Sequence, residues 1–139
     1  MTLKKKVRLC ITSNMRDDAG QLHTMKYARR GVLKAVQTAY TLEYDDEQDG
    51  EKAHITLTAD AGRAQMVRRG MTSACLSFEP GRRTASAYVT MYGEIPVAVD
   101  THKVCVLGDE NGGSLTLDYD VYMGGEKTSS AVFEVAWRA

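Results

Sequence analysis

Apolar and polar residues alternate along most of this chain, most clearly from Ser114 to Met123. That segment reads Ser-Leu-Thr-Leu-Asp-Tyr-Asp-Val-Tyr-Met, so nearly every second side chain is apolar. Successive side chains of a β-strand point to opposite faces, so this two-residue period predicts a strand with one buried and one solvated face. A chain of such strands is expected to form an antiparallel sheet that buries one side.

Weaker forms of the same pattern predict about ten strands separated by turns rich in glycine and proline. The first strand contains Val7, Leu9 and Ile11, and the second starts near Leu22. The others are predicted near residues 40–44, 55–59, 66–71, 74–78, 85–92, 97–107, 114–123 and 132–137. One segment, Arg29 to Gln37, also has apolar residues at helical spacing, so a short helix is the alternative there.

An all-β chain with short connections folds either as a sandwich or as a closed barrel. Closure removes exposed strand edges, and successive hairpins favour an up-and-down meander. We therefore predict a single antiparallel meander β-barrel of about 8–10 strands, formed by residues 1–139 as one domain. The interior of such a barrel is wide enough for side chains or for one small ligand.

The charges of the chain balance, with 18 basic and 18 acidic side chains. No overall field therefore attracts the protein to nucleic acid or to an anionic membrane, so the sequence predicts no membrane partner and disfavours nucleic acid. Three basic clusters, Lys4 to Lys6, Arg29-Arg30 and Arg82-Arg83, are candidates for a local basic patch. A solvated face is the favoured interpretation of these clusters, because aromatic content is low.

Several short motifs follow one another in a familiar order: Thr41-Leu42-Glu43-Tyr44, Arg69-Gly70, Thr90-Met91-Tyr92-Gly93, Val99-Asp100-Thr101 and Leu115-Thr116-Leu117-Asp118-Tyr119. In this order they resemble the YwiB-like family of uncharacterised bacterial proteins, which is grouped with calycin-type barrels alongside lipocalins and fatty-acid-binding proteins. The resemblance implies a calycin-like barrel. It does not imply lipocalin ligand chemistry, because the early tryptophan of lipocalins is missing and the only tryptophan is Trp137.

The adjacent residues Arg68 and Arg69 interrupt the strand pattern, because in a regular strand one of them must point inward. Arg69 shares a face with Val67 and Met71, so we predict that Arg69 is the inward one. A buried guanidinium is costly unless carboxylates or carbonyls pair with it. It could therefore hold an anionic ligand inside the barrel. The favoured alternative is an internal pair with Glu43, Asp100, Glu134 or a backbone carbonyl at the barrel end.

Tyrosines form the second candidate cluster. Tyr44 and Tyr119 alternate with polar neighbours in the apolar phase of their strands, so both are predicted to point inward. Together with Arg69, Tyr92 and Thr101 they form the candidate ligand-binding set. The strand pattern leaves the orientation of Tyr88 and Tyr92 open. The alternative is that tyrosine simply fills the barrel, as a favoured strand residue.

Other chemistry receives little support from the sequence. Cys10, Cys75 and Cys105 lack any Cys-x-x-Cys spacing, so we expect reduced core thiols without disulfide or zinc. The acidic loop Asp45 to Gly50 resembles a calcium loop, but Thr56 stands where the closing glutamate belongs. The sequence therefore predicts no metal, no cofactor and no catalytic residue.

The leading hypothesis is a cytoplasmic, non-enzymatic calycin-like barrel that binds a small anionic or amphipathic molecule in its lumen. The expectation of a cytoplasmic protein comes from the first strand, where Arg8 and Thr12 break the apolar stretch and no cleavage site follows. The alternative hypothesis is an interaction module that binds protein or RNA through its outer face or through an open strand edge.

Overall fold

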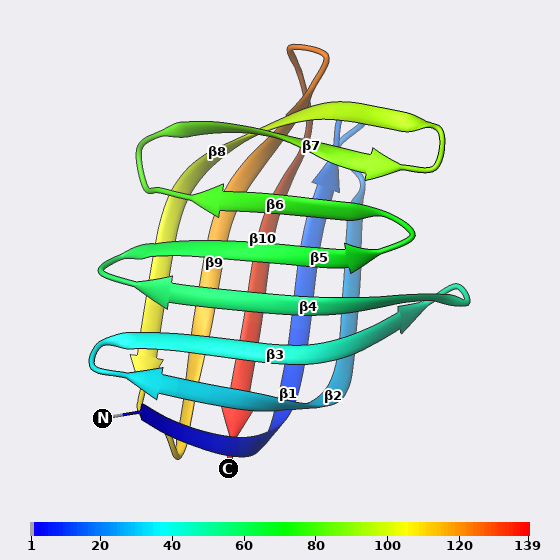
Figure 1. Ribbon diagram of the computed structural model, residues 1–139. Helices are drawn as coiled ribbons and strands as arrows, with labels where there is room; N and C mark the ends of the chain where they lie inside the picture. Colours follow the sequence, from blue (N-terminus) through cyan, green and yellow to red (C-terminus); the bar gives the residue numbers. More distant parts are fainter. Residues whose placement is uncertain (1) are drawn as a thin grey trace.

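Ten β-strands form the fold (Figure 1). The computed structural model describes residues 2–139, and within this range no helix is long and apolar enough to cross a membrane. The strands are β1 (Thr2–Asp17), β2 (Leu22–Val36), β3 (Ala39–Gln48), β4 (Glu51–Asp60), β5 (Arg63–Gly70), β6 (Ser73–Phe78), β7 (Arg83–Thr90), β8 (Gly93–Gly108), β9 (Gly112–Met123) and β10 (Glu126–Arg138).

The strands follow one another around a closed antiparallel barrel, which confirms the predicted up-and-down meander. Each strand pairs with the next one in sequence, and β10 pairs with β1 to close the circle, with Leu9 opposite Trp137. In Figure 1, β3 to β7 cross in front of β8, β9 and β10 at a steep angle, so the barrel has two layers of differently directed strands.

The long strand β2 takes part in both layers. It pairs with β1 from Leu22 to Val36, but with β3 only from Gly31 to Val36. The first half of β2 therefore diverges from the β3–β4 hairpin, and this divergence leaves an opening between them at one end of the barrel.

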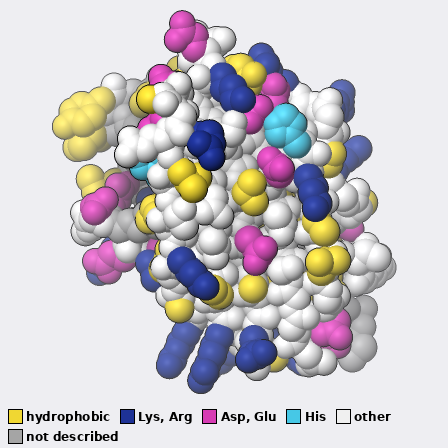
Figure 2. Space-filling model, turned by 180° about the vertical axis from the view of Figure 1, so that it is seen from behind, with side chains coloured by type: hydrophobic (Ala, Val, Ile, Leu, Met, Phe, Trp, Pro, Cys, Tyr) yellow, Lys and Arg dark blue, Asp and Glu magenta, His cyan; other side chains and the backbone are white. Residues whose placement is uncertain are grey.

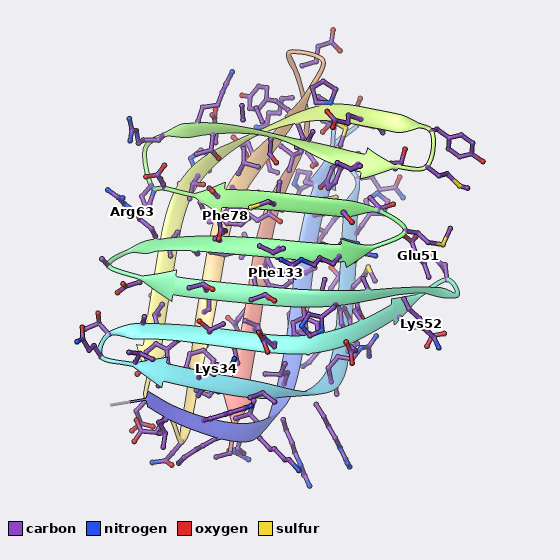
Figure 3. The ribbon with its side chains drawn as sticks, viewed as in Figure 1. Lys34, Glu51, Lys52, Arg63, Phe78 and Phe133 are labelled. Atoms are coloured by element: carbon purple, nitrogen blue, oxygen red, sulfur yellow. The ribbon has the colours of Figure 1, made fainter. Side chains whose placement is uncertain are left out.

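The core lies inside the barrel, because alternate side chains of the strands point inward. Phe78 and Tyr119 meet there, with ring centroids 4.9 Å apart. Phe78 and Phe133, both labelled in Figure 3, belong to this buried core. The side chains buried most deeply are those of Leu9, Ile11, Leu33, Leu42, Leu57, Phe78, Val99, Leu117 and Val135.

The alternative helix at Arg29 to Gln37 is wrong, because most of this segment belongs to β2. Its apolar residue Leu33 is buried and lies opposite Leu42 of β3, as a strand residue does. A side chain at Gly31 would collide with β3, since an added Cβ would lie 2.5 Å from the carbonyl oxygen of Glu43. Glycine at this position thus allows two strands to approach closely.

The pairing between β6 and β7 is the shortest in the barrel. Their backbones pair only at Ser73–Val89 and Ala74–Tyr88. Further along the two strands, a hydrogen bond from a side chain links them: the hydroxyl of Thr84 donates to the carbonyl oxygen of Ser77 at 2.6 Å. This weak seam has few backbone bonds to break and lies next to Tyr88, an inner residue described below.

The expectation of core thiols is wrong for two of the three cysteines. Cys10 and Cys75 are exposed, and Cys105 is half-buried. Cys10 stands between the buried residues Leu9 and Ile11, so strand alternation turns its thiol outward.

Candidate ligand-binding site

Five polar side chains form a continuous row inside the barrel, which we call the inner polar row. They come from five strands. Each side chain either lies opposite the next one in the register of the sheet or lies close enough to shift the pKa of its neighbour. In spatial order they are Tyr44 on β3, Arg68 on β5, Tyr88 on β7, Tyr119 on β9 and Thr101 on β8.

Arg68 points into the barrel because it shares the inner face of β5 with Ala64 and Met66. Its side chain is 26% exposed, and the carboxylate oxygen Oε1 of Glu51 lies 4.0 Å from Nη2. Glu51 also accepts a hydrogen bond of 3.1 Å from the backbone N–H of Thr72. Among the described residues the guanidinium therefore has only one carboxylate, at long range and shared with another donor.

The three tyrosines of the row are largely buried, and burial raises the pKa of each hydroxyl. Burial, with a smaller contribution from Tyr88, raises the pKa of Tyr119 to about 12. The pKa of Tyr44 rises further, first through burial and then through Tyr27 and Asp46, although nearby arginines oppose this. The pKa of Tyr88 is also raised by burial, and Arg68 partly opposes it. All three hydroxyls are therefore neutral at physiological pH and can donate hydrogen bonds.

Thr101 ends the row with an unusual feature. Its side chain is 2% exposed, and its hydroxyl oxygen Oγ1 has no hydrogen-bond partner among the described residues. A buried hydroxyl without a partner is destabilising, and such groups are uncommon in folded proteins. The β8–β9 register shifts directly after Thr101, so a bulge at His102 changes the direction of the strand there.

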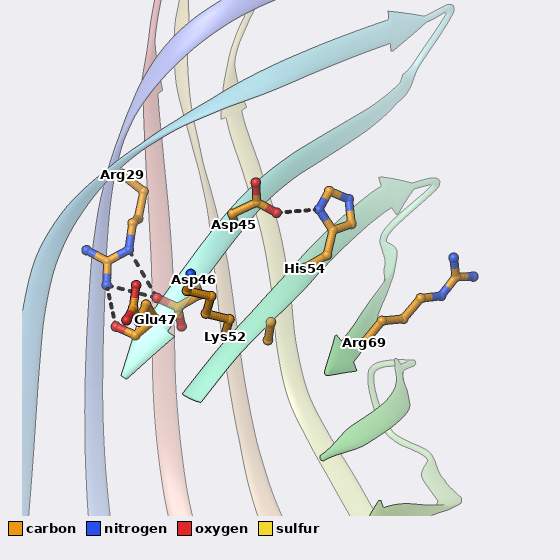
Figure 4. A pocket seen from close by; sticks show the side chains of 8 residues that line it. Arg29, Asp45, Asp46, Glu47, Lys52, His54 and Arg69 are labelled. Carbon is orange, nitrogen blue, oxygen red and sulfur yellow. Dashed lines mark hydrogen bonds and ion pairs between the residues drawn. The ribbon is translucent and has the colours of Figure 1, made fainter. Parts of the chain in front are cut away.

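A hollow of about 840 Å³ opens at the end of the barrel where β2 and the β3–β4 hairpin diverge (Figure 4). Figure 3 shows Glu51 and Lys52 at this end of the front strands and Arg63 at the opposite end. The hollow is lined by Arg29, Asp45, Asp46, Glu47, Lys52, Ala53, His54 and Arg69.

One ion pair and one hydrogen bond join residues that line this hollow (Figure 4). Arg29 bridges the opening from β2, with Nη2 2.9 Å from Oδ1 of the buried Asp46. On the outer surface, Nδ1 of His54 lies 2.8 Å from Oδ1 of Asp45. Arg69, directly opposite His54 in the sheet, has no carboxylate partner among the described residues and stays available as a cation.

The sequence prediction placed Arg69 inside the barrel, and this orientation is wrong. Arg69 is exposed, and its neighbour Arg68 points inward. The prediction assumed that Val67 and Met71 mark the inner face of the strand. However, β5 ends at Gly70, so Met71 lies in the turn with its side chain 66% exposed. Arg69 nevertheless lines the hollow at the mouth of the barrel.

Tyr92 is also misplaced as a lumen residue, because its side chain is 92% exposed. The strand β7 ends at Thr90, whose hydroxyl accepts from the backbone N–H of Tyr92 at 3.1 Å and fixes the turn. The predicted inward orientation of Tyr44 and Tyr119 is confirmed, and Thr101 is buried as well.

Two members of the row, Arg68 and Tyr88, were missing from the candidate set. A signal for Arg68 exists in the sequence, since Ala64, Met66 and Arg68 alternate with polar Gln65. The orientation of Tyr88 follows from its partner strand, because it lies opposite Ala74, a buried residue of β6. No group of three or more His, Cys, Asp or Glu side chains within residues 2–139 is placed to hold a metal ion.

These features define a closed, ten-stranded, up-and-down β-barrel with a polar row inside and a charged hollow at its mouth. The chain matches the family described as domain of unknown function DUF1934 over residues 10–135, and it belongs to that family. The resemblance to YwiB-like proteins seen in the motifs is thereby confirmed.

Two comparisons with a relative from Bacillus subtilis (strain 168) agree with this assignment. The chain is 24% identical over 121 residues to the "Uncharacterized beta-barrel protein YwiB", a match that covers 87% of this chain and 84% of the relative. The crystal structure of the ywiB protein from Bacillus subtilis superimposes with a TM-score of 0.88 at 20% identity, covering 98% of this chain and 92% of the other. This structural match shows that the two proteins share the same fold.

Proposed function

We propose that this protein is a non-enzymatic binding protein that takes up a small anionic molecule, such as a carboxylate or a phosphate ester, inside its barrel. The observation that carries this proposal is the inward guanidinium of Arg68, whose nearest carboxylate, Glu51, is 4.0 Å away. A guanidinium presents a rigid fork of N–H donors that matches two oxygens of a carboxylate or phosphate. A bound anion would give Arg68 the close partner that Glu51 does not supply.

The rest of the inner polar row supports a polar ligand. Tyr44 and Tyr88 flank Arg68 with neutral hydroxyls, which can donate to further oxygens of an anion. The unpartnered hydroxyl of Thr101 marks the far end of the row. A chain of hydroxyls beside one cation is suited to a compact, oxygen-rich anion.

The packing of the interior favours a small ligand over a long acyl chain. Beyond the row the barrel is filled by side chains such as Phe78 and Leu117, both fully buried. Phe78 also lies in edge contact with Tyr119. An extended hydrocarbon chain would need this core to rearrange, because protein interiors are close-packed.

The hollow at the mouth is the side from which a ligand would approach the row. It reaches the inner face of the barrel at Ala53, two residues along β4 from Ile55, which lies opposite Arg68. Arg69 and Lys52 stand at its rim, where exposed cations raise the local concentration of anions. Arg69 thus keeps an accessory role as an entry cation, in place of the lumen role that the sequence predicted.

A ligand screen tests the proposal. Melting temperatures are measured with a panel of small carboxylates, sugar phosphates and nucleotides, and each compound that stabilises the protein is titrated by calorimetry. At a concentration 100 times its Kd, a ligand stabilises the folded state by about 2.7 kcal/mol. The variant Arg68→Met should lose this stabilisation.

Arg69→Met is the matched control, since it removes the same charge one residue away on the outer face. Because Arg69 lies at the rim, it should retain most of the affinity and show slower association. The proposal is refuted if no compound stabilises the protein, or if Arg68→Met responds to the ligand as the wild type does.

A further inference from the structure

A second charged feature lies outside the barrel, separate from the inner polar row. Five exposed cations from three neighbouring strands form it: Lys4, Lys6 and Arg8 of β1, Arg30 of β2 and Arg138 of β10. We call this surface the basic face. Figure 2 shows Lys and Arg side chains gathered along the lower edge of the molecule, the end at which Figure 1 marks both termini.

The register of the sheet brings three arginines side by side. Arg8 lies directly opposite Arg30 on one side and directly opposite Arg138 on the other. Neighbouring strands are about 4.8 Å apart, so the three side chains start from a row about 10 Å wide. Like charges directly opposite each other on paired strands are destabilising.

A second row of cations runs along β1 and meets the first at Arg8. Lys4, Lys6 and Arg8 are alternate residues, so they share the outer face and follow one another at about 6.8 Å. The residue between the two lysines, Lys5, lies off this row and donates to Oδ1 of Asn111 at 2.6 Å. The two rows make an extended, two-dimensional array of positive charge.

Carboxylates do not neutralise the basic face. None of its five cations has an ion pair among the residues that the structure describes, whereas the adjacent Lys34 has Glu43 at 4.0 Å. The chain as a whole has no net charge, so this concentration reflects local placement. An anionic partner would turn the mutual repulsion of the arginines into attraction.

The shape of the face indicates the kind of anion. The arginines surround a shallow hollow of about 470 Å³, lined by Lys6, Val7, Arg8, Arg30, Gly31, Val32, Arg138 and Ala139. None of these residues is aromatic, so the hollow has no platform on which unpaired bases could stack. Because the cations are spread in two rows at regular spacing, they match an anion that carries several negative charges at regular spacing.

We propose that the basic face binds the phosphate backbone of double-stranded nucleic acid without reading its sequence. The duplex presents phosphates at regular intervals, and Arg and Lys side chains that contact them fix the position of the protein while carrying no base specificity. This surface revises the expectation from the balanced net charge, because a neutral chain can still bind a polyanion through one face.

The test is the salt dependence of binding to a fluorescent DNA duplex of about 20 base pairs, followed by anisotropy. Five phosphate contacts give a slope of about −4.5 in log K against log salt, so the affinity falls about 500-fold between about 50 and 200 mM salt. The triple variant Arg8→Gln, Arg30→Gln, Arg138→Gln keeps two contacts, so its affinity should fall only about 12-fold over the same range.

A charge-matched control separates local contacts from net charge. The triple variant Arg63→Gln, Arg82→Gln, Lys103→Gln removes three exposed cations elsewhere on the barrel and should keep the wild-type slope. Circular dichroism and thermal melting check that both variants fold. If the basic-face triple fails to fold, the single variant Arg8→Gln carries the test, with a slope reduced by about 0.9.

Three outcomes would overturn the proposal. They are no binding of the duplex at the lowest salt, with or without binding of phosphatidylglycerol vesicles, equal losses in the two triple variants, and tighter binding of the corresponding single strand. A reduced slope confined to the basic-face variants supports it.

Discussion

Replacing Arg68 by methionine tests whether the fold itself needs this guanidinium. The substitution keeps a flexible apolar stem of similar reach and removes the charge and its N–H donors. If Arg68 serves a ligand, the unliganded protein should tolerate the change. If Arg68 is a structural ion-pair partner, the protein should lose stability.

The geometry sets the expected magnitude. At 4.0 Å, the attraction between the charges of Arg68 and Glu51 is about 4 kcal/mol at an effective dielectric constant of about 20. Withdrawing two ions from water costs several kcal/mol and offsets most of this gain. We therefore expect the free energy of unfolding of Arg68→Met to lie within about 1 kcal/mol of the wild-type value. This limit corresponds to a change in Tm of at most about 4 °C.

Urea titrations at neutral pH, followed by far-UV circular dichroism, measure this difference. A double-mutant cycle adds Glu51→Gln and the double variant, and the coupling energy between the two side chains should stay below about 1 kcal/mol. A loss of about 3–5 kcal/mol in Arg68→Met would refute the reasoning, because that is the effect of removing one partner from a buried ion pair that the fold depends on.

Two further predictions concern the packing of the barrel. An alanine at Gly113 would bring its Cβ against the backbone carbonyl oxygen of Leu107 and place it 2.6 Å from Cζ2 of Trp137. Gly113→Ala should therefore cost about 1–3 kcal/mol and shift the emission of the only tryptophan. Gly112→Ala, with its nearest neighbour at 3.7 Å, should change little. Equal losses in fluorescence-monitored unfolding would contradict this. Burial raises the pKa of Tyr119 to about 12, while in the unfolded chain it is about 10. The unfolded state therefore releases this proton first, and stability present below pH 10 falls by about 1.4 kcal/mol per pH unit as the pH rises towards 12. Tyr119→Phe should lose less stability over this interval than Tyr92→Phe, the control for removal of one tyrosine hydroxyl, and parallel curves for the two variants would contradict the prediction.

The sequence predicted the strands best where one face is buried along the whole element. The segment Ser114 to Met123 corresponds to β9 almost residue for residue, because its inner side chains are apolar and its outer ones polar. The first strand was predicted within the first twelve residues, although β1 extends from Thr2 to Asp17. After Thr12 this strand has polar residues on both faces, so alternation no longer distinguishes the core from the solvent.

The sequence predicted the types of residue in the candidate site correctly but placed the arginine one position too late in the strand. An arginine among tyrosines was expected inside the barrel, and the structure has one, but at Arg68 instead of Arg69. Both faces of β5 contain an apolar residue, Met66 on one and Val67 on the other, so hydrophobicity alone does not decide between them. The decision comes from the neighbouring strands, since Arg68 lies opposite the buried residues Ile55 and Ala74.

Adjacent arginines on one strand lie in separate parts of this barrel, because strand alternation sends them to opposite faces. On β2, Arg29 turns towards the mouth and pairs with Asp46, while Arg30 joins the basic face. On β5, Arg68 belongs to the inner polar row and Arg69 lies outside. Substitutions at distant sites that share no partners have nearly additive effects. Loss of ligand binding in Arg68→Met should therefore leave the salt slope for duplex DNA unchanged, and substitution of Arg30 should leave ligand binding unchanged. A variant on one face that impaired both activities would show that the two surfaces bind parts of a single partner.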